Sequence, residues 1–335
     1  MNQSWDSVGN TPLIYINSLS EMTGCHIWGK AEFKNPGGSI KDRAAKQIII
    51  EAEESGQLKP KGTIVEGTAG NTGIGLALLG MQRGYKVIIT MPNNQAKEKV
   101  EELTRLGAEI LQYPPCPFSN PGHFYHQARI YAENNPGVFW ANQFENLANY
   151  RAHYKYTGTE IWNQSQGKID FFLASVGSGG TIGGVSRFLK DTLTTMKKPS
   201  SSIQIIAADP YGSGILEFLK SGQFKSEGSS VTEGIGIMRL TENFKQAIVD
   251  RCLRISDQEM IDMLFHLKDK DQLFVGLSSA LNLAGVFKIA LENKNSGKSF
   301  VTMLCDHGDR YRSKILSPEW LNEKNLHSQP LKNNG

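Results

Sequence analysis

The chain has 335 residues, 39% of them hydrophobic, which is enough for about two domains with apolar cores. Its 36 basic and 33 acidic residues are mixed along the chain and leave a net charge of +3, so no basic run predicts binding to nucleic acid or to an anionic membrane. No apolar run approaches the roughly 20 residues that a membrane-spanning helix needs, which argues against a membrane protein.

The first elements that the sequence predicts are two strands, at residues 12–16 and 27–32, which form a hairpin and join one of the sheets. Turn-forming residues at 35–38 then predict a tight loop. Ser39, followed three residues later by Asp42, matches a capping box, which marks the start of a helix.

Lys41 falls in the first turn of this helix, which is expected to end near Gly56. The N-terminal end of the helix dipole is positive and disfavours an ammonium, so we expect a lowered pKa for Lys41. An amine with a lowered pKa is what Schiff-base chemistry requires. On this stretch alone, the alternative of a solvated surface lysine stays open.

Short apolar runs alternate with helical patterns along the rest of the chain. In the first block the sequence predicts helices at 74–81, 96–106 and 123–133 between strands at 63–66, 85–91, 109–113 and 138–141. In the second block a helix at 156–162 precedes strands at 169–175, 203–208, 273–275 and 299–305. This alternation implies parallel sheets covered by helices on both faces. We therefore expect an α/β fold with two doubly wound, mostly parallel sheet domains and the active site in the cleft between them.

A glycine-rich loop follows the strand expected at 169–175 and opens a helix; its residues are Gly177, Ser178, Gly179, Gly180 and Thr181. Glycines let several N–H groups converge on one anion, and the helix N-terminus adds partial positive charge. The two hydroxyls can donate as well. The loop predicts a phosphate-binding cup, with a plain tight turn as the alternative.

The loop lacks residues that nucleotide-binding motifs need, and this indicates which type of phosphate compound it binds. Ile182 breaks the G-x-G-x-x-G dinucleotide pattern, and Val185 stands where a nucleotide P-loop needs lysine. A single phosphate monoester fits best. Pyridoxal phosphate has one, together with an aldehyde that needs a lysine such as Lys41. Asp209, at the end of the next strand, keeps a ribose-binding alternative open.

Two further loops lie at strand ends. Residues 67–73 open a helix and can hold a second anion such as a substrate carboxylate. Within them, Asn71 offers both a donor and an acceptor, or else caps the helix. Residues 276–280 include Ser278, which can hydrogen-bond a neutral pyridine nitrogen or cap the helix expected at 281–289.

The four cysteines are far apart, with no CxxC pair and no zinc-like spacing: Cys25, Cys116, Cys252 and Cys305. This pattern predicts free, buried thiols in a reducing compartment. Because the polar N-terminus also lacks a signal-peptide core, a cytoplasmic location is expected.

Taken together, these motifs resemble the cysteine synthase family, the O-acetylserine sulfhydrylases, among the β-family (fold type II) pyridoxal-phosphate enzymes. The resemblance runs from residues 9–13 to 308–311 and includes 34–43, 67–73, 177–181 and 276–279. It implies a β-replacement enzyme in which sulfide displaces acetate from O-acetyl-L-serine to give L-cysteine. It also implies a homodimer that has an amino-acid substrate and sulfide as its small-molecule partners.

The resemblance assigns roles to individual residues. Lys41 carries the Schiff base and acts as the catalytic base, and Gly177 to Thr181 hold the phosphate of the cofactor. Asn71 bonds the cofactor 3′-oxygen, and Ser278 bonds the pyridine nitrogen. The substrate lies against residues from three separate loops: Thr68, Ala69, Gly70, Thr72, Gln143 and Gly234.

The resemblance also implies a division of the chain. Residues 1–48 form an N-terminal segment that carries the cofactor lysine and contributes to both domains. Residues 49–147 form a smaller, mobile α/β domain, and residues 148–322 form a larger domain that binds the cofactor. Independently of the resemblance, the polar composition of residues 323–335 predicts a loose tail.

The chain departs from the family pattern at three places. Ala69 replaces a serine, the proline-rich loop at 114–122 is longer than usual, and residues 305–307 replace a small serine-rich loop. Cys305, Asp306 and His307 can ligate metals, but adjacent residues rarely bind one ion, so we expect no metal site.

Three other functions remain open. A cystathionine β-synthase-like enzyme and an O-phosphoserine-using β-replacement enzyme share the fold. From another class, a non-catalytic dinucleotide-binding regulator would use residues 177–181 and Asp209.

Overall fold

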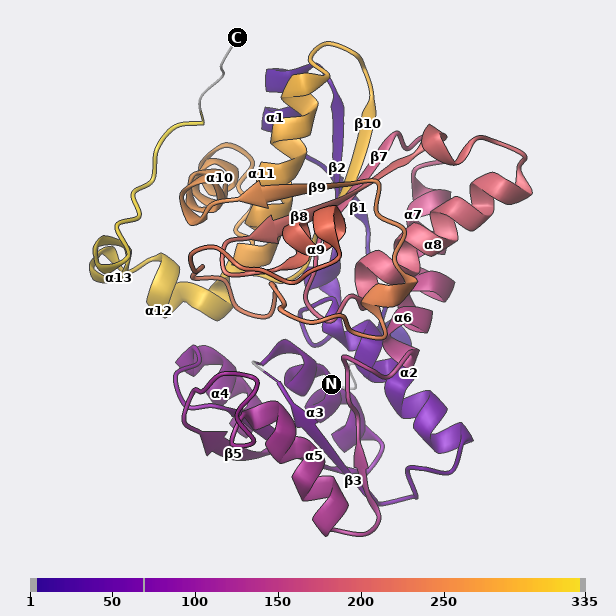
Figure 1. Cartoon of the computed structure of the whole chain (residues 1–335), viewed down its shortest axis with the longest axis vertical. Helices are drawn as coiled ribbons and strands as arrows, with labels where there is room; N and C mark the ends of the chain where they lie inside the picture. The colour runs from indigo at the N-terminus through magenta and orange to yellow at the C-terminus, as the bar shows by residue number, and fades with distance from the viewer. Residues whose placement is uncertain (1–4, 69, 332–335) are drawn as a thin grey trace.

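The structure, a computed structural model, describes residues 5–68 and 70–331. Two parallel sheets form its framework, which confirms the expected α/β class. The four-stranded sheet has the order β5-β4-β3-β6, and the six-stranded sheet has the order β1-β2-β10-β7-β8-β9. We call the parts built on them the small lobe and the large lobe; Figure 1 shows the two lobes stacked, with helix α2 at their junction.

The strands pair in parallel throughout, apart from the antiparallel pair β1–β2. The small lobe contains β3 (Thr63–Gly67), β4 (Lys86–Pro92), β5 (Glu109–Tyr113) and β6 (Val138–Trp140). The large lobe contains β1 (Leu13–Tyr15), β2 (His26–Ala31), β7 (Phe171–Ser175), β8 (Gln204–Pro210), β9 (Arg251–Ile255) and β10 (Ser299–Leu304).

Helices connect these strands and cover both faces of each sheet. In the first half of the chain they are α1 (Asn17–Thr23), α2 (Lys41–Glu54), α3 (Asn71–Gln82), α4 (Lys97–Arg105), α5 (Phe124–Asn134), α6 (Ala148–Ala152) and α7 (Thr159–Gln164), with a π-helix (His153–Gly158) joining α6 to α7. In the second half they are α8 (Gly180–Thr195), α9 (Ile215–Ser221), α10 (Asp257–Lys270), α11 (Leu277–Glu292), α12 (Arg312–Ile315) and α13 (Pro318–Glu323). Within the described ranges, no helix is both long and apolar enough to span a bilayer.

Successive side chains of a strand point to opposite faces of the sheet, so each lobe has two hydrophobic cores. Along β7, Phe171 belongs to the core under α10 and α11, whereas Phe172 belongs to the core under α8. Along β3, Ile64 and Val65 likewise enter separate cores. Strands buried on both faces explain why these segments read as continuous apolar runs.

The prediction of a strand at residues 273–275 is wrong. At residues 273–275 only Val275 makes a β-contact, an isolated bridge to His307, because the Leu273 N–H bonds the end of α10 instead. The sixth strand of the large sheet is β9, which the sequence analysis missed. β9 lies at the edge of the sheet and has arginines at both Arg251 and Arg254, so it lacks the apolar run of a central strand.

The N-terminal expectations need two changes. Strands β1 and β2 do pair antiparallel, but α1 lies between them, so they are not a tight hairpin. The capping box is also wrong: Ile40 precedes α2, and the Asp42 carboxylate folds back to accept from the Gly37 N–H at 2.5 Å. The Ser39 hydroxyl accepts instead from the Lys41 N–H at 3.2 Å.

The helix boundaries differ in the second block, and so does the tail. The helix expected at 281–289 begins at Leu277, and the one expected at 156–162 continues a longer run that contains the π-helix. The described part of the tail is not loose, because Leu326 is buried and the Gln329 N–H bonds Asp262 on α10. The rest of the tail, residues 332–335, lies outside the described residues.

The cysteines are free, as expected, but only Cys25 is buried. The other three are partly exposed. The expectation that all four are buried is therefore wrong.

A buried ionic cluster fixes the start of α2. The Arg43 guanidinium bonds Glu32 at 2.6 and 2.8 Å and Glu160 at 2.7 Å, and Lys30 bonds Glu160 at 2.7 Å. Further along α2, Ile48 packs in the core of the small lobe. The helix is thus tied to the large lobe at its start and to the small lobe along its length.

We predict that Arg43→Ala lowers the free energy of unfolding by about 3–5 kcal/mol, because it leaves two carboxylates without their shared partner. Arg129→Ala is the matched control, since it breaks only the exposed pair with Glu133 on α5 and should change stability by less than about 0.5 kcal/mol. Urea unfolding of both variants checks this. Equal losses for the two variants would contradict the structural role of the cluster.

Candidate active site

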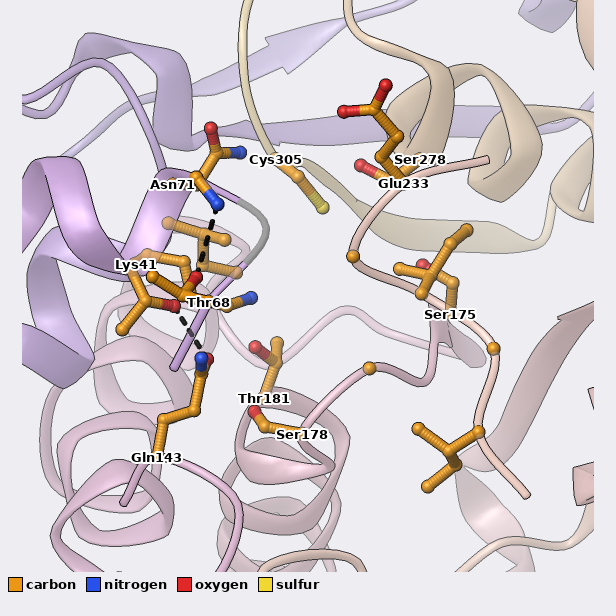
Figure 2. Close-up of a pocket in the computed structure, with 18 of the residues that line it drawn as sticks. Lys41, Thr68, Asn71, Gln143, Ser175, Ser178, Thr181, Glu233, Ser278 and Cys305 are labelled. Atoms are coloured by element: carbon orange, nitrogen blue, oxygen red, sulfur yellow. Dashed lines mark hydrogen bonds between the residues drawn. The ribbon is translucent and has the colours of Figure 1, made fainter. Parts of the chain in front are cut away.

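A pocket lies between the lobes, at the carboxyl ends of β3 and β7 (Figure 2). It gathers nearly all of the predicted site residues: Lys41, Thr68, Gly70, Asn71, Thr72, Gln143, Gly177, Ser178, Gly179, Thr181, Gly234 and Ser278. Gly180 lies behind them in the first turn of α8. Ala69 lies outside the described residues.

Lys41 is the first residue of α2 and lines the pocket. Burial lowers the pKa of Lys41, and the nearby Lys99 ammonium lowers it further, while the Asp306 carboxylate acts in the opposite direction. The direction of the pKa shift agrees with the expectation, but burial is the main cause. A desolvated amine of this kind has the nucleophilic form that imine formation requires.

The glycine-rich loop forms the opposite wall. Gly179 has a left-handed backbone with φ of 89°, and a Cβ there would lie 2.6 Å from the Phe244 Cα. The turn leads into α8, and the pocket is lined by Ser178 just before this helix and by Thr181 in its first turn. N–H and O–H donors at the start of a 16-residue helix fit the phosphate of a cofactor.

The third wall is built around Gln143. The Thr72 hydroxyl donates to Gln143 Oε1 at 2.6 Å, which fixes the amide, and the Gln143 N–H donates to Glu66 Oε1 at 3.3 Å. Glu66 is fully buried, and burial raises its pKa to about 8. The acid behind this wall is therefore mostly uncharged at neutral pH and adds little negative charge to the pocket.

Asn71 is oriented by the large lobe. Its Nδ2 donates to Asp306 Oδ2 at 2.6 Å, and its Oδ1 accepts from Arg310 Nη1 at 2.6 Å. Tyr311 donates to the same Asp306 oxygen at 2.7 Å. Because α3 begins at Asn71 itself, after Gly70, the alternative role as a helix cap is wrong.

Ser278 lies in the first turn of α11 and faces the pocket. The residue that precedes this helix is Gly276, so the capping alternative for Ser278 is also wrong. Cys305 lines the pocket nearby, and burial raises its pKa to about 12, so its thiol stays protonated. His307 points elsewhere and packs edge-on against Phe274.

Asp209 does not line the pocket. It is buried, accepts from the Leu216 N–H at 2.9 Å and pairs with Arg254 at 2.9 Å. Its carboxylate therefore holds α9 and β9 in place, which removes the main support for a ribose-binding site. Among the described residues, no group of three or more His, Cys, Asp or Glu could hold a metal ion.

The sequence analysis missed a cross-lobe ion pair at the pocket. Lys99 on α4 bonds Glu233 at 2.6 Å, and Lys314 bonds the other oxygen of Glu233. The Lys99 ammonium also lies 4.4 Å from the ring centroid of Tyr311. No local pattern marks these residues, because the partners are 134 and 81 residues apart in sequence.

Comparison with known proteins explains why Lys41, the glycine-rich loop and Ser278 line one pocket. Residues 5–306 match the family described as "Pyridoxal-phosphate dependent enzyme", and the chain belongs to that family. Its cofactor is pyridoxal phosphate. The pocket fits this group, because it offers a desolvated lysine amine, an anion-binding loop and the hydroxyl of Ser278.

The relatives narrow the resemblance to the cysteine synthases of fold type II. The chain is 47% identical to "Cysteine synthase 1" of Neurospora crassa, over 96% of this chain and 84% of the relative. It is 45% identical to "Cysteine synthase" of Dictyostelium discoideum, over 98% and 87%. Among solved structures, it resembles an O-acetylserine-dependent cystathionine β-synthase from Helicobacter pylori, with a TM-score of 0.83, 31% identity, and coverage of 94% of this chain and 98% of that one.

We predict that Glu66→Gln changes how stability depends on pH. The folded-state pKa of about 8 lies above the ordinary value of 4.5, so folded Glu66 keeps a proton that the unfolded chain releases. Glu66 therefore makes stability fall as pH rises from about 5 to 8. Denaturant titrations should show that the unfolding free energy of Glu66→Gln minus that of the natural chain increases as pH rises across that range. A difference independent of pH would contradict the raised pKa.

Proposed function

We propose that the chain is a cysteine synthase: it replaces the acetate group of O-acetyl-L-serine with sulfide and so yields L-cysteine and acetate. The observation that carries this proposal is the meeting of the desolvated Lys41 amine with the glycine-rich loop 177–181 and the polar groups around Gln143 in one pocket. The names of the cysteine synthase relatives support L-cysteine as the product, and the O-acetylserine-dependent enzyme from Helicobacter pylori supports O-acetylserine as the donor.

Each wall of the pocket would have its own task. Loop 177–181 would hold the cofactor phosphate, Asn71 its 3′-oxygen and Ser278 its ring nitrogen. Lys41 would hold the cofactor aldehyde. When bound, pyridoxal phosphate supplies a conjugated ring that accepts the electrons released at the substrate Cα.

The substrate would occupy the side of Lys41 that faces Gln143. N–H and O–H donors from Thr68, Gly70, Thr72 and Gln143 would bind its carboxylate, and Gly234 would lie at the entrance. Lys41 Nζ would then take the Cα proton as general base. The ion pair between Lys99 and Glu233 joins the two lobes at this point and would help to exclude water.

The nucleophile and the donor are the parts of the proposal that need a direct test. The Helicobacter pylori structure is of an O-acetylserine-dependent cystathionine β-synthase, so homocysteine is the second candidate nucleophile. O-phosphoserine is the second candidate donor. Assays that pair each donor with each nucleophile, with mass detection of cysteine and cystathionine, separate these activities. The proposal predicts cysteine from O-acetylserine and sulfide as the main product.

Lys41→Ala should reduce the turnover rate by about 10³-fold or more, because it removes the catalytic base and the attachment point of the cofactor together. Borohydride reduction of the natural protein, followed by peptide mapping, should place the cofactor on Lys41. Lys46→Ala is a control on the same helix, since Lys46 lies against Trp5 outside the pocket. A label on any other lysine, or full activity of Lys41→Ala, would refute the assignment.

We also propose a homodimer located in the cytoplasm, with a small domain at 49–147 that moves against a larger domain at 148–322. The family suggests the dimer and the movement, and the free cysteines favour a reducing compartment. Light scattering should give twice the chain mass of 37.0 kDa. A monomer mass at all concentrations would exclude the dimer.

A further inference from the structure

Two polar side chains stand directly behind the phosphate-binding loop without lining the pocket. Asn149 on α6 donates through Nδ2 to the Ser178 hydroxyl at 2.8 Å. His153, the first residue of the π-helix, lies with Nε2 3.2 Å from the Thr181 hydroxyl. Each hydroxyl of the loop therefore has one partner on the side away from the pocket.

Close packing at two glycines of α8 holds both partners in place. A Cβ at Gly180 would lie 2.1 Å from Asn149 Oδ1, and a Cβ at Gly184 would lie 2.5 Å from the Tyr150 carbonyl. Only glycines at these positions let α8 approach α6 and the π-helix so closely. The contacts behind the loop are thus part of the packing of two helical segments.

The direction of the first hydrogen bond follows from chemistry. An amide nitrogen can only donate, so the Asn149 bond occupies a lone pair of the Ser178 oxygen. The hydroxyl hydrogen of Ser178 remains available for an anion in the pocket.

For His153 the direction depends on the tautomer. The ring is buried, and burial places its pKa well below the usual value, so it is neutral and has one N–H and one acceptor nitrogen. Its Nδ1 lies 2.9 Å from the hydroxyl of Thr157, which can donate or accept. If Nδ1 carries the proton, Nε2 must accept the Thr181 hydrogen, which then points away from the pocket.

The opposite tautomer satisfies every group when an anion is bound. Thr157 then donates to Nδ1, the Nε2–H donates to the Thr181 oxygen, and the Thr181 hydrogen points into the pocket. We propose that His153 is a positioning residue that holds this tautomer and so directs the Thr181 hydroxyl to the phosphate of the cofactor. This inference rests on the proposed placement of that phosphate in loop 177–181.

The test compares His153→Asn with His153→Gln. The asparagine amide reaches the place of Nδ1 and keeps the contact with Thr157, whereas the glutamine amide nitrogen reaches the place of Nε2 and can still donate to Thr181. After removal of the cofactor, the dissociation constant of pyridoxal phosphate is measured by fluorescence titration. We expect a weakening of about 10-fold for His153→Asn and of less than about 3-fold for His153→Gln.

Two further measurements show whether the effect acts through the phosphate. Pyridoxal, which lacks the phosphate, should bind the two variants and the natural protein equally. Thr181→Val should weaken pyridoxal phosphate binding about as much as His153→Asn, and the double variant should be no weaker than Thr181→Val alone. The phosphorus NMR signal of the bound cofactor should shift in His153→Asn and not in His153→Gln.

The outcomes separate this inference from the placement on which it rests. If Thr181→Val weakens binding but His153→Asn does not, or if the Asn and Gln variants weaken it equally, His153 is only a packing residue and the inference fails alone. If Thr181→Val leaves the dissociation constant unchanged, the phosphate does not lie in this loop and both proposals fail.

Discussion

The buried contact of Arg43 with Glu32 and Glu160 is the interaction on which the geometry of the pocket depends. Lys41 is only two residues away on the same helix, so the cluster fixes the lysine relative to the large sheet. The apolar side of α2, through Ile48, also belongs to the core of the small lobe. Because α2 is tied to both lobes, Lys41 at its start lines a pocket whose groups come from each of them.

Helix α8 imposes a second constraint through its glycines. Gly179 makes the turn, Gly180 leaves room for the Asn149 side chain of α6, and Gly184 lets α8 meet the backbone of α6 and the π-helix. The sequence analysis assigned Gly179 and Gly180 only a role in binding a phosphate. In this fold the glycines act equally by bringing Asn149 and His153 within reach of the hydroxyls that face the pocket. The same glycines thus shape the loop and also allow Asn149 and His153 to support it.

The parts of the site that the sequence predicted are those in which a reactive or polar residue and the turn that places it lie in one short segment of the chain. Lys41, Asn71 and the loop from Gly177 to Thr181 each follow or begin a recognisable element, so position in the chain implied position in the fold. The supporting contacts escaped prediction because they join distant segments; Asn71 and Asp306 are 235 residues apart. Strand β9 was missed for another reason, since its edge position makes an apolar run unnecessary.

Apart from the ion pair of Lys99 with Glu233, four titratable groups in or behind the pocket share a further property: burial shifts each of them towards its uncharged form. It lowers the pKa of Lys41 and of His153 and raises those of Glu66, to about 8, and Cys305, to about 12. At the proposed anion sites, the polar groups of the pocket are therefore mainly fixed N–H and O–H dipoles, which need no reorganisation as charge develops. The protonation of Cys305 matters most, because a thiolate at that place would stabilise the Lys41 ammonium. The desolvation that keeps this thiol protonated thus also preserves the free amine of Lys41.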